Sequence, residues 1–148
     1  HHHMGTIIET QRDTERLLDN THDSVKLTLD TGHMLFAKGD SKSILENYNE
    51  RLFHVHCKDI RKDVLEKSLK ENLSFRAAFL EGAFTVPGDG CIDYEPLFEV
   101  LKKNNYSGWF VVEAEQDPVK ANPFEYAKIG YKYLTETLSK SKIEVFKN

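Results

Sequence analysis

Three segments of this chain that read as strands each carry, near their end, an ionisable side chain of a type that binds metals. Asp30 ends VKLTLD, His56 lies in LFHVHCKD, and Glu113 lies in WFVVEAE. Burying carboxylates and imidazoles costs several kcal/mol unless something compensates them, and neighbouring acids repel one another. A bound cation removes both penalties, and a mixed oxygen and nitrogen donor set suits Mn, Co, Zn or Mg. The three residues therefore predict a divalent metal site.

The polar side chains fall on one side of an alternating pattern. Parallel strands that helices cover on both faces are normally apolar throughout, because both faces are dry. Here Leu27 and Leu29 oppose Thr28 and Asp30. The same alternation places Phe53, Val55 and Cys57 on the apolar side, and on the polar side His54, His56, Lys58, Glu113 and Glu115.

Each feature also has an ordinary structural reading. A His-x-His pair such as His54 and His56 is more often partly exposed than metal-bound. Glu113 and Glu115 alone would form surface ion pairs on an edge strand, and Asp30 before a Thr-Gly pair would form a turn. Three such features on three consecutive strands favour a shared site.

The elements that must position these residues alternate between strands and amphipathic helices. We predict helices over residues 10–20, 41–52 and 93–103 and from Asn122-Pro123 onward, with one or two more between residues 62 and 82. Residues 30–40 and VPGDG read as a loop and a turn. This order indicates an α/β fold with a parallel sheet of three strands and a candidate fourth strand ending at HHHMGT. In a closed β/α barrel, active sites assemble at the C-terminal ends of the strands.

The composition of the 148 residues argues against two classes of partner. A formal net charge of −4, with no block of Lys and Arg, disfavours nucleic acid and membrane surfaces. We find no run of about 18 apolar residues and no signal peptide. Cys57 and Cys91 lack metal-binding or disulfide spacing, which fits a reducing compartment, and we expect a cytoplasmic protein.

Four stretches of the sequence resemble a known family. LTLDTGHMLFAKGD, HVHCKDIRKDVL, FTVPGDGCIDYEPLFEVL and GWFVVEAEQDP are similar to the C-terminal half of inosose dehydratases, within the sugar isomerase and epimerase superfamily of xylose-isomerase-like TIM barrels. HHHMGT, which alone would read as the remnant of a purification tag, also resembles a native stretch of that family. The resemblance implies a (β/α)8 barrel of about 250 residues. Residues 1–148 would form the C-terminal half of this single domain, as three to four βα units.

The resemblance also implies a ligand set for one divalent metal, with Mn or Co the expected ion. Asp30, His56 and Glu113 match three ligands that the family places on three strands. The fourth ligand is expected from the opening of the chain, where the candidates are His3, His1 and Glu9.

The implied reaction is the elimination of water from 2-keto-myo-inositol, a cyclic polyol ketone, in inositol breakdown. Its difficult step is the removal of a proton next to the ketone. We expect Glu113, His33 and Lys58 to be the catalytic residues. The residues expected to bind substrate hydroxyls are His33, His54, Lys58 and Glu115.

Three other readings stay open at this point. The first is a metal-dependent ketose isomerase or epimerase of the same fold. The second is a DNA-repair endonuclease of the same superfamily, which the acidic net charge disfavours. The third is an inactive fragment that needs the N-terminal half of the barrel, or pairs with another copy, because half a barrel leaves strand edges unpaired.

Overall fold

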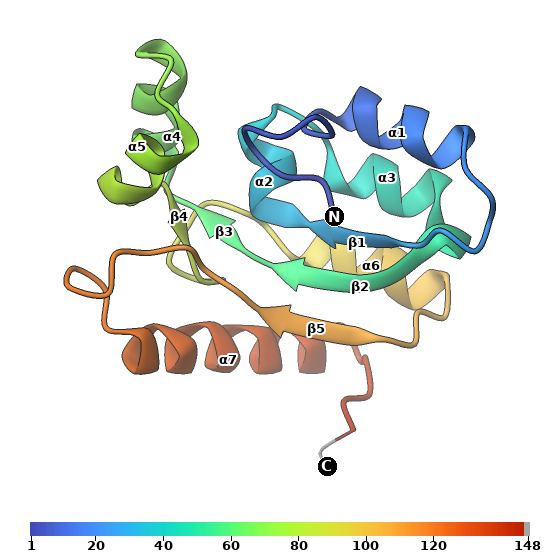
Figure 1. Cartoon of the computed structure of the whole chain (residues 1–148). Helices are drawn as coiled ribbons and strands as arrows, with labels where there is room; N and C mark the ends of the chain where they lie inside the picture. The colour runs from blue at the N-terminus through green and yellow to red at the C-terminus, as the bar shows by residue number, and fades with distance from the viewer. Residues whose placement is uncertain (147–148) are drawn as a thin grey trace.

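The computed structural model describes residues 1–146, in which a parallel sheet is flanked by helices (Figure 1). The strands are β1 (Leu27–Asp30), β2 (Leu52–Cys57), β3 (Asp59–Ile60), β4 (Phe84–Thr85) and β5 (Trp109–Val112). The α-helices are α1 (Gln11–Asp19), α2 (Thr31–Phe36), α3 (Ser41–Asn47), α4 (Lys62–Lys70), α5 (Phe75–Glu81), α6 (Glu95–Lys103) and α7 (Pro123–Lys140). A short 3₁₀ helix, η1 (Asn49–Arg51), precedes β2.

The main sheet consists of three parallel strands in the order β1-β2-β5. Asp30 lies opposite His56, and His56 lies opposite Val111. The three arrows of Figure 1 point toward the same side, so the carboxyl ends of the strands meet at one edge of the sheet. The parallel sheet expected from the sequence is present, and it brings the predicted site residues to one end.

Helices cover one face of this sheet and share a single hydrophobic core with it. The strands contribute Leu27, Leu29, Val55 and Cys57 to this core. The buried helical residues come from α1, α2, α3, α6 and α7, namely Leu18, Met34, Ile44, Leu45, Leu97, Phe98, Val100, Leu101, Leu134 and Leu138. Each such side chain contributes about 1.5–3 kcal/mol when fully buried. The core therefore fixes which face of each strand points toward the helices.

The register of β2 corrects one detail of the predicted alternation. Phe53 was expected on the buried side of the strand but is 58% exposed. The pairing is irregular at this point, because Leu27 lies opposite Leu52 whereas Thr28 lies opposite His54. Leu52 therefore packs against the core in place of Phe53.

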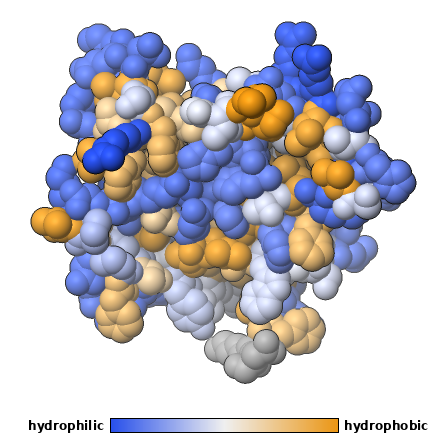
Figure 2. Space-filling view, viewed as in Figure 1, coloured by the Kyte–Doolittle hydropathy of each residue, from blue (hydrophilic) through white to orange (hydrophobic). Residues whose placement is uncertain are grey.

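Apolar side chains also remain exposed on the strand faces that carry the polar residues. Trp109, opposite His54, is 63% exposed, and Val111, opposite His56, is 36% exposed. Figure 2 shows hydrophobic patches among polar residues on the face of the molecule seen in Figure 1. The described residues thus leave part of the sheet uncovered.

A smaller unit follows β2; its two helices lie where the sequence predicts them, between residues 62 and 82, but its two short strands were not predicted. β3 and β4 pair antiparallel, with Asp59 opposite Thr85 and Ile60 opposite Phe84. α4 and α5 contribute to a second hydrophobic core around Ile60 and Phe84, and they stand together beyond the end of the main sheet in Figure 1. Gly82 ends α5 with φ of 86°, as its position in the sequence predicts.

Three predicted boundaries are wrong. Residues 30–40, expected as a loop, contain α2, because the Asp30 side chain caps that helix by accepting the His33 N–H. The helix predicted over residues 41–52 is divided into α3 and η1. The segment WFVVEAE is a strand only to Val112, so Glu113 and Glu115 lie on the loop that follows β5.

The first and last parts of the described chain differ in regularity. Residues 1–9 contain no helix or strand, so the candidate fourth strand is not found there. The side chain of His2 nevertheless fixes this opening segment to β1 through the Asp30 N–H. α7 begins at Pro123 after its cap Asn122, as predicted. None of the helices within residues 1–146 has the length and apolarity needed to cross a membrane.

Substitution of Gly90 tests the packing of the VPGDG turn. A Cβ at this position would lie 2.7 Å from the Ile60 backbone nitrogen and closer still to the Asp59 carboxylate. That carboxylate accepts the N–H groups of Ile60 at 2.8 Å and Ile92 at 2.9 Å. We expect Gly90→Ala to lower the free energy of unfolding by about 1–3 kcal/mol, measured by urea denaturation. Glu99→Ala, at an exposed position of α6, is the control, and equal stability of the two variants would contradict this packing.

Candidate metal centre

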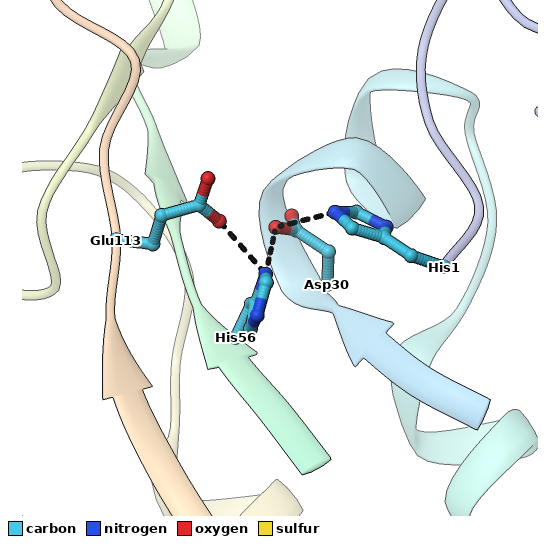
Figure 3. A group of neighbouring side chains, drawn as sticks. All are labelled: His1, Asp30, His56 and Glu113. Atoms are coloured by element: carbon cyan, nitrogen blue, oxygen red, sulfur yellow. Dashed lines mark ion pairs between the residues drawn. The ribbon is translucent and has the colours of Figure 1, made fainter. Parts of the chain in front are cut away.

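Four potential ligand atoms converge at the carboxyl ends of the parallel strands, and we call these residues the first cluster (Figure 3). His56 Nδ1 lies 2.9 Å from Glu113 Oε2 and 3.5 Å from Asp30 Oδ2. His1 Nε2 approaches the same Asp30 oxygen at 3.9 Å. The ligand atoms of the four residues all lie within 4.8 Å of one another. One small cation can therefore reach all of them.

Three atoms of the first cluster are buried and lack a hydrogen-bond partner within the described chain, namely Asp30 Oδ2, His56 Nδ1 and Glu113 Oε2. An unsatisfied buried polar group costs about 1–3 kcal/mol. Each of these atoms is also a donor that divalent metals accept. A metal ion would compensate all three at once, so the donor set fits a divalent cation.

Lys58 follows β2 and places a fully buried ammonium between three carboxylates. Its Nζ lies 2.7 Å from Glu115 Oε2, 3.3 Å from Glu113 Oε1 and 3.4 Å from Asp30 Oδ2. Burial acts to lower the pKa of Lys58, but the neighbouring carboxylates outweigh burial and raise that pKa above its usual value. Lys58 therefore stays charged at neutral pH.

The carboxylates of the site differ in how readily they bind a proton. Burial acts against the charge of Asp30, but His56, Lys58 and His33 outweigh it and hold the pKa of Asp30 far below its usual range. Similarly, contacts with His33 and Lys58 outweigh burial and lower the pKa of Glu115 to about 2. Burial and the nearby Asp30 raise the pKa of Glu113 instead, so Glu113 is the most basic of the three carboxylates.

A second cluster, formed by His3, His33 and Glu115, adjoins the first. His3 Nε2 lies 3.3 Å from Glu115 Oε1, and His33 Nε2 lies 3.1 Å from Glu115 Oε2. His3 Nδ1 donates to the Met4 carbonyl at 2.7 Å, so its Nε2 presents a lone pair when the ring is neutral. His33 Nδ1 accepts the Met4 N–H at 3.3 Å, so a neutral His33 carries its proton on Nε2 and donates to Glu115.

Asp30 is oriented from two sides. Its Oδ1 accepts the His33 N–H at 2.9 Å at the start of α2, which leaves Oδ2 facing the first cluster. Its own backbone N–H donates to Nε2 of His2 at 3.2 Å. The His2 ring is fully buried, and burial lowers the pKa of His2 to about 4, so the ring is neutral and able to accept. The sequence analysis missed this role. His1, His2 and His3 are identical residues in an irregular segment, and only the path of the backbone decides which ring is buried against β1.

The structure brings Asp30, His56 and Glu113 together, as the sequence predicts. It places His1 beside them, whereas His3, the first choice for the fourth ligand, lies in the second cluster. The third candidate, Glu9, instead accepts the backbone N–H of Gly5 at 2.8 Å. The choice between these residues depends on the path of an irregular segment, which no periodicity in the sequence reveals.

The residues predicted to contact substrate divide into buried and accessible groups. His33 and Lys58 are fully buried, and both contact the Glu115 carboxylate. Glu113 and Glu115 keep 32% and 27% of their side-chain surface exposed. His54 precedes His56 on the same face of β2 but belongs to neither cluster of the described residues. Solvent therefore reaches the two glutamates, and it also reaches His1, His3 and His56, which are exposed to a similar degree.

A family model described as the xylose isomerase-like TIM barrel matches residues 1–137. The chain belongs to the xylose isomerase-like TIM barrel family. The parallel strands with helices on one face form part of such a barrel, which confirms the fold class expected from the sequence. The match begins at His1, so the opening histidines lie inside the family's region.

Curated relatives share about half of their residues with this chain over the matched region. The inosose dehydratase of Clostridium beijerinckii is 54% identical over 137 residues, which are 92% of this chain and 46% of that protein. The rhizopine catabolism protein MocC of Rhizobium meliloti is 50% identical over 134 residues, which are 90% of this chain and 41% of that protein. The chain thus spans about half the length of the curated relatives it matches.

A solved structure shows the same TIM-barrel arrangement at lower sequence similarity. The IOLI protein, crystallised with a bound zinc atom, superposes with a TM-score of 0.65 and 21% identity over 90% of this chain and 45% of that one. At this identity the likeness establishes the fold.

Removal of single ligands tests the first cluster. We expect Asp30→Ala, His56→Ala and Glu113→Ala each to weaken Mn²⁺ binding by at least about 10-fold, because each removes a donor atom. Titration calorimetry measures the affinity, and circular dichroism checks the fold. His22→Ala, at an exposed histidine, is the matched control. Undiminished affinity in all three variants would rule out a shared metal centre.

Replacement of His2 tests the support behind Asp30. The ring of His2→Phe has a similar size but cannot accept the Asp30 N–H. We expect about 10-fold weaker Mn²⁺ binding, since a misplaced supporting group costs about 10–100-fold in affinity. His22→Phe serves as the control, and an unchanged affinity of His2→Phe would show that the hydrogen bond has no role in the site.

Proposed function

We propose that this chain carries the metal-binding part of the active site of a lyase that eliminates water from 2-keto-myo-inositol. The observation that carries the proposal is the convergence of Asp30, His56 and Glu113 with unpaired ligand atoms at the carboxyl ends of three parallel strands. Support for the substrate comes from the relative that is 54% identical and is named inosose dehydratase. Because the chain spans about half of that protein, the activity is proposed for a complete barrel, in which residues 1–148 form the C-terminal half.

The proposed cofactor is a divalent metal, with Mn or Co as the physiological ion. Asp30, His56, Glu113 and His1 would hold it, since their ligand atoms already face one another. When bound, such an ion supplies Lewis-acid stabilisation of negative charge on the substrate oxygens.

Glu113 is the base in this proposal. The elimination requires that a carboxylate take the proton next to the ketone, that the released electron pair form a carbon–carbon double bond, and that the neighbouring hydroxyl depart as water. The two oxygens of Glu113 face different neighbours: Oε2 lies 2.9 Å from His56 Nδ1 in the first cluster, and Oε1, 3.3 Å from Lys58 Nζ, is the oxygen that would take the proton. Its partial exposure gives a substrate access to the carboxylate.

Lys58 supplies the proton for the departing hydroxyl. The Lys58 ammonium is protonated and would give its proton to the departing hydroxyl, while the ionised Glu115, 2.7 Å from Lys58 Nζ, holds that ammonium in place. His33 holds Glu115 from the buried side at 3.1 Å. His54, on the accessible face of β2, is assigned to a substrate hydroxyl.

The partner needed for activity is the missing N-terminal half of the barrel or a second copy of the chain. The exposed Trp109 and Val111 on the sheet mark the surface that such a partner would cover. Two unpaired cysteines, Cys57 and Cys91, fit the cytoplasm as the proposed compartment.

A chimeric enzyme tests this function. We expect that replacing the matching part of the Clostridium beijerinckii inosose dehydratase by this chain preserves dehydration of 2-keto-myo-inositol, followed by the ultraviolet absorbance of the conjugated dione. Glu113→Gln should lower the rate by about 10²–10⁴-fold, since general base catalysis is removed, while His22→Ala leaves it unchanged. The unmodified 148-residue chain, assayed in parallel, shows whether it acts alone. A folded, metal-loaded chimera that converts only free ketoses would contradict the proposal in favour of an isomerase or epimerase.

A further inference from the structure

The Lys58 ammonium occupies a position with the surroundings of a cation site. Three carboxylates, from Glu115, Glu113 and Asp30, lie within 3.4 Å of Nζ. Carboxylate oxygens are ligands that a divalent ion such as Mn²⁺ takes in proteins. Here an ammonium from the chain itself fills that position.

The second cluster offers further donors at this point. His3 Nε2 presents a lone pair toward the Glu115 carboxylate, 3.3 Å away, because its Nδ1 is engaged by the Met4 carbonyl. Two acceptors that face each other repel unless a proton or a cation lies between or beside them. The Lys58 ammonium, 2.7 Å from Glu115, supplies the nearest positive charge.

The side chain of Lys58 is fixed along its length. The backbone carbonyl of Lys58 accepts hydrogen bonds from the Thr31 hydroxyl at 2.6 Å and the Tyr94 hydroxyl at 3.0 Å, which fixes the start of the side chain. Its stem packs on Gly32, where an added Cβ would lie 2.7 Å from the Lys58 Cγ. The ammonium itself lies 5.4 Å from the centre of the Phe84 ring. The positive charge is therefore held in place by packing and is not free to move to solvent.

The charges in the two clusters balance with one metal ion. Asp30, Glu113 and Glu115 carry three negative charges, and Lys58 carries one positive charge. One divalent ion in the first cluster makes the group neutral, whereas a second ion beside Lys58 would bring like charges together at short range in a buried place.

We propose that Lys58 stands in for a second divalent cation and thereby limits this site to one metal ion. The inference rests on the proposed function, since it takes the first cluster as the metal centre of that enzyme. With a neutral side chain at this position, the carboxylates of Glu115, Glu113 and Asp30, with His3, are open to a second ion. Lys58 is thus the residue that sets the metal count.

The experiment compares the number of Mn²⁺ ions bound per chain, measured by equilibrium dialysis and elemental analysis. We expect one ion on the unmodified chain and two on Lys58→Met, whose side chain keeps the apolar stem. The double variant Lys58→Met/Glu115→Gln should return to one ion, because it removes the carboxylate nearest to the vacated position. Lys70→Met, at an exposed lysine of α4, should bind the same number as the unmodified chain. Two ions that share carboxylates should also replace the six-line Mn²⁺ electron paramagnetic resonance spectrum by an exchange-coupled one.

Equal counts on the unmodified chain and Lys58→Met would overturn the inference, as would two ions on the unmodified chain. If Lys58→Met does not fold, Lys58→Gln gives the same comparison with a side chain that still donates to Glu115. The count on the unmodified chain alone tests the proposed function. If that chain binds no Mn²⁺ ion, the first cluster is not a metal centre. A gain of one ion on removal of Lys58 supports the inference independently of dehydratase activity.

Discussion

The structure depends on an excess of buried negative charge where three parallel strands end. Asp30, Glu113 and Glu115 converge there on the single ammonium of Lys58. One ammonium cannot neutralise three carboxylates, and Asp30 Oδ2 and Glu113 Oε2 have no hydrogen-bond partner among the described residues. Because Asp30 is fully buried and the two glutamates are half-buried, a further cation, or a carboxyl group that takes a proton, would stabilise this arrangement. The raised pKa of Glu113 in the absence of a metal identifies it as the first of the three carboxylates to take a proton as the pH falls.

The same strands serve the core and the site through their two faces. Leu29, Val55 and the other core residues pack against helices, while alternate positions face the clusters. The parallel register then places Asp30 opposite His56 without any further device. Asp30 takes part in both the fold and the site, because one of its oxygens caps α2 and the other faces His56. A substitution of Asp30 would therefore also remove the hydrogen bond that caps the first turn of α2.

Sequence patterns revealed the parts of this arrangement that follow strand periodicity. Asp30 and His56 are predictable because each lies on the polar side of an otherwise apolar strand. The place of His1, and the support from His2, could not be predicted, since residues 1–9 have no regular structure and therefore no periodicity. β3 and β4 escaped notice because strands of two residues are too short to show alternation. α2 was missed because its opening Thr-Gly pair after Asp30 is also typical of a turn.

The most direct test of the central claim is anomalous diffraction at the manganese edge from crystals of the chain grown with Mn²⁺. The account predicts one anomalous peak, within about 2.0–2.6 Å of a carboxylate oxygen of Asp30 and of one from Glu113, and at similar range from the imidazole of His56. A fully occupied peak elsewhere, with the ligand atoms of Asp30, His56 and Glu113 unoccupied, would contradict it.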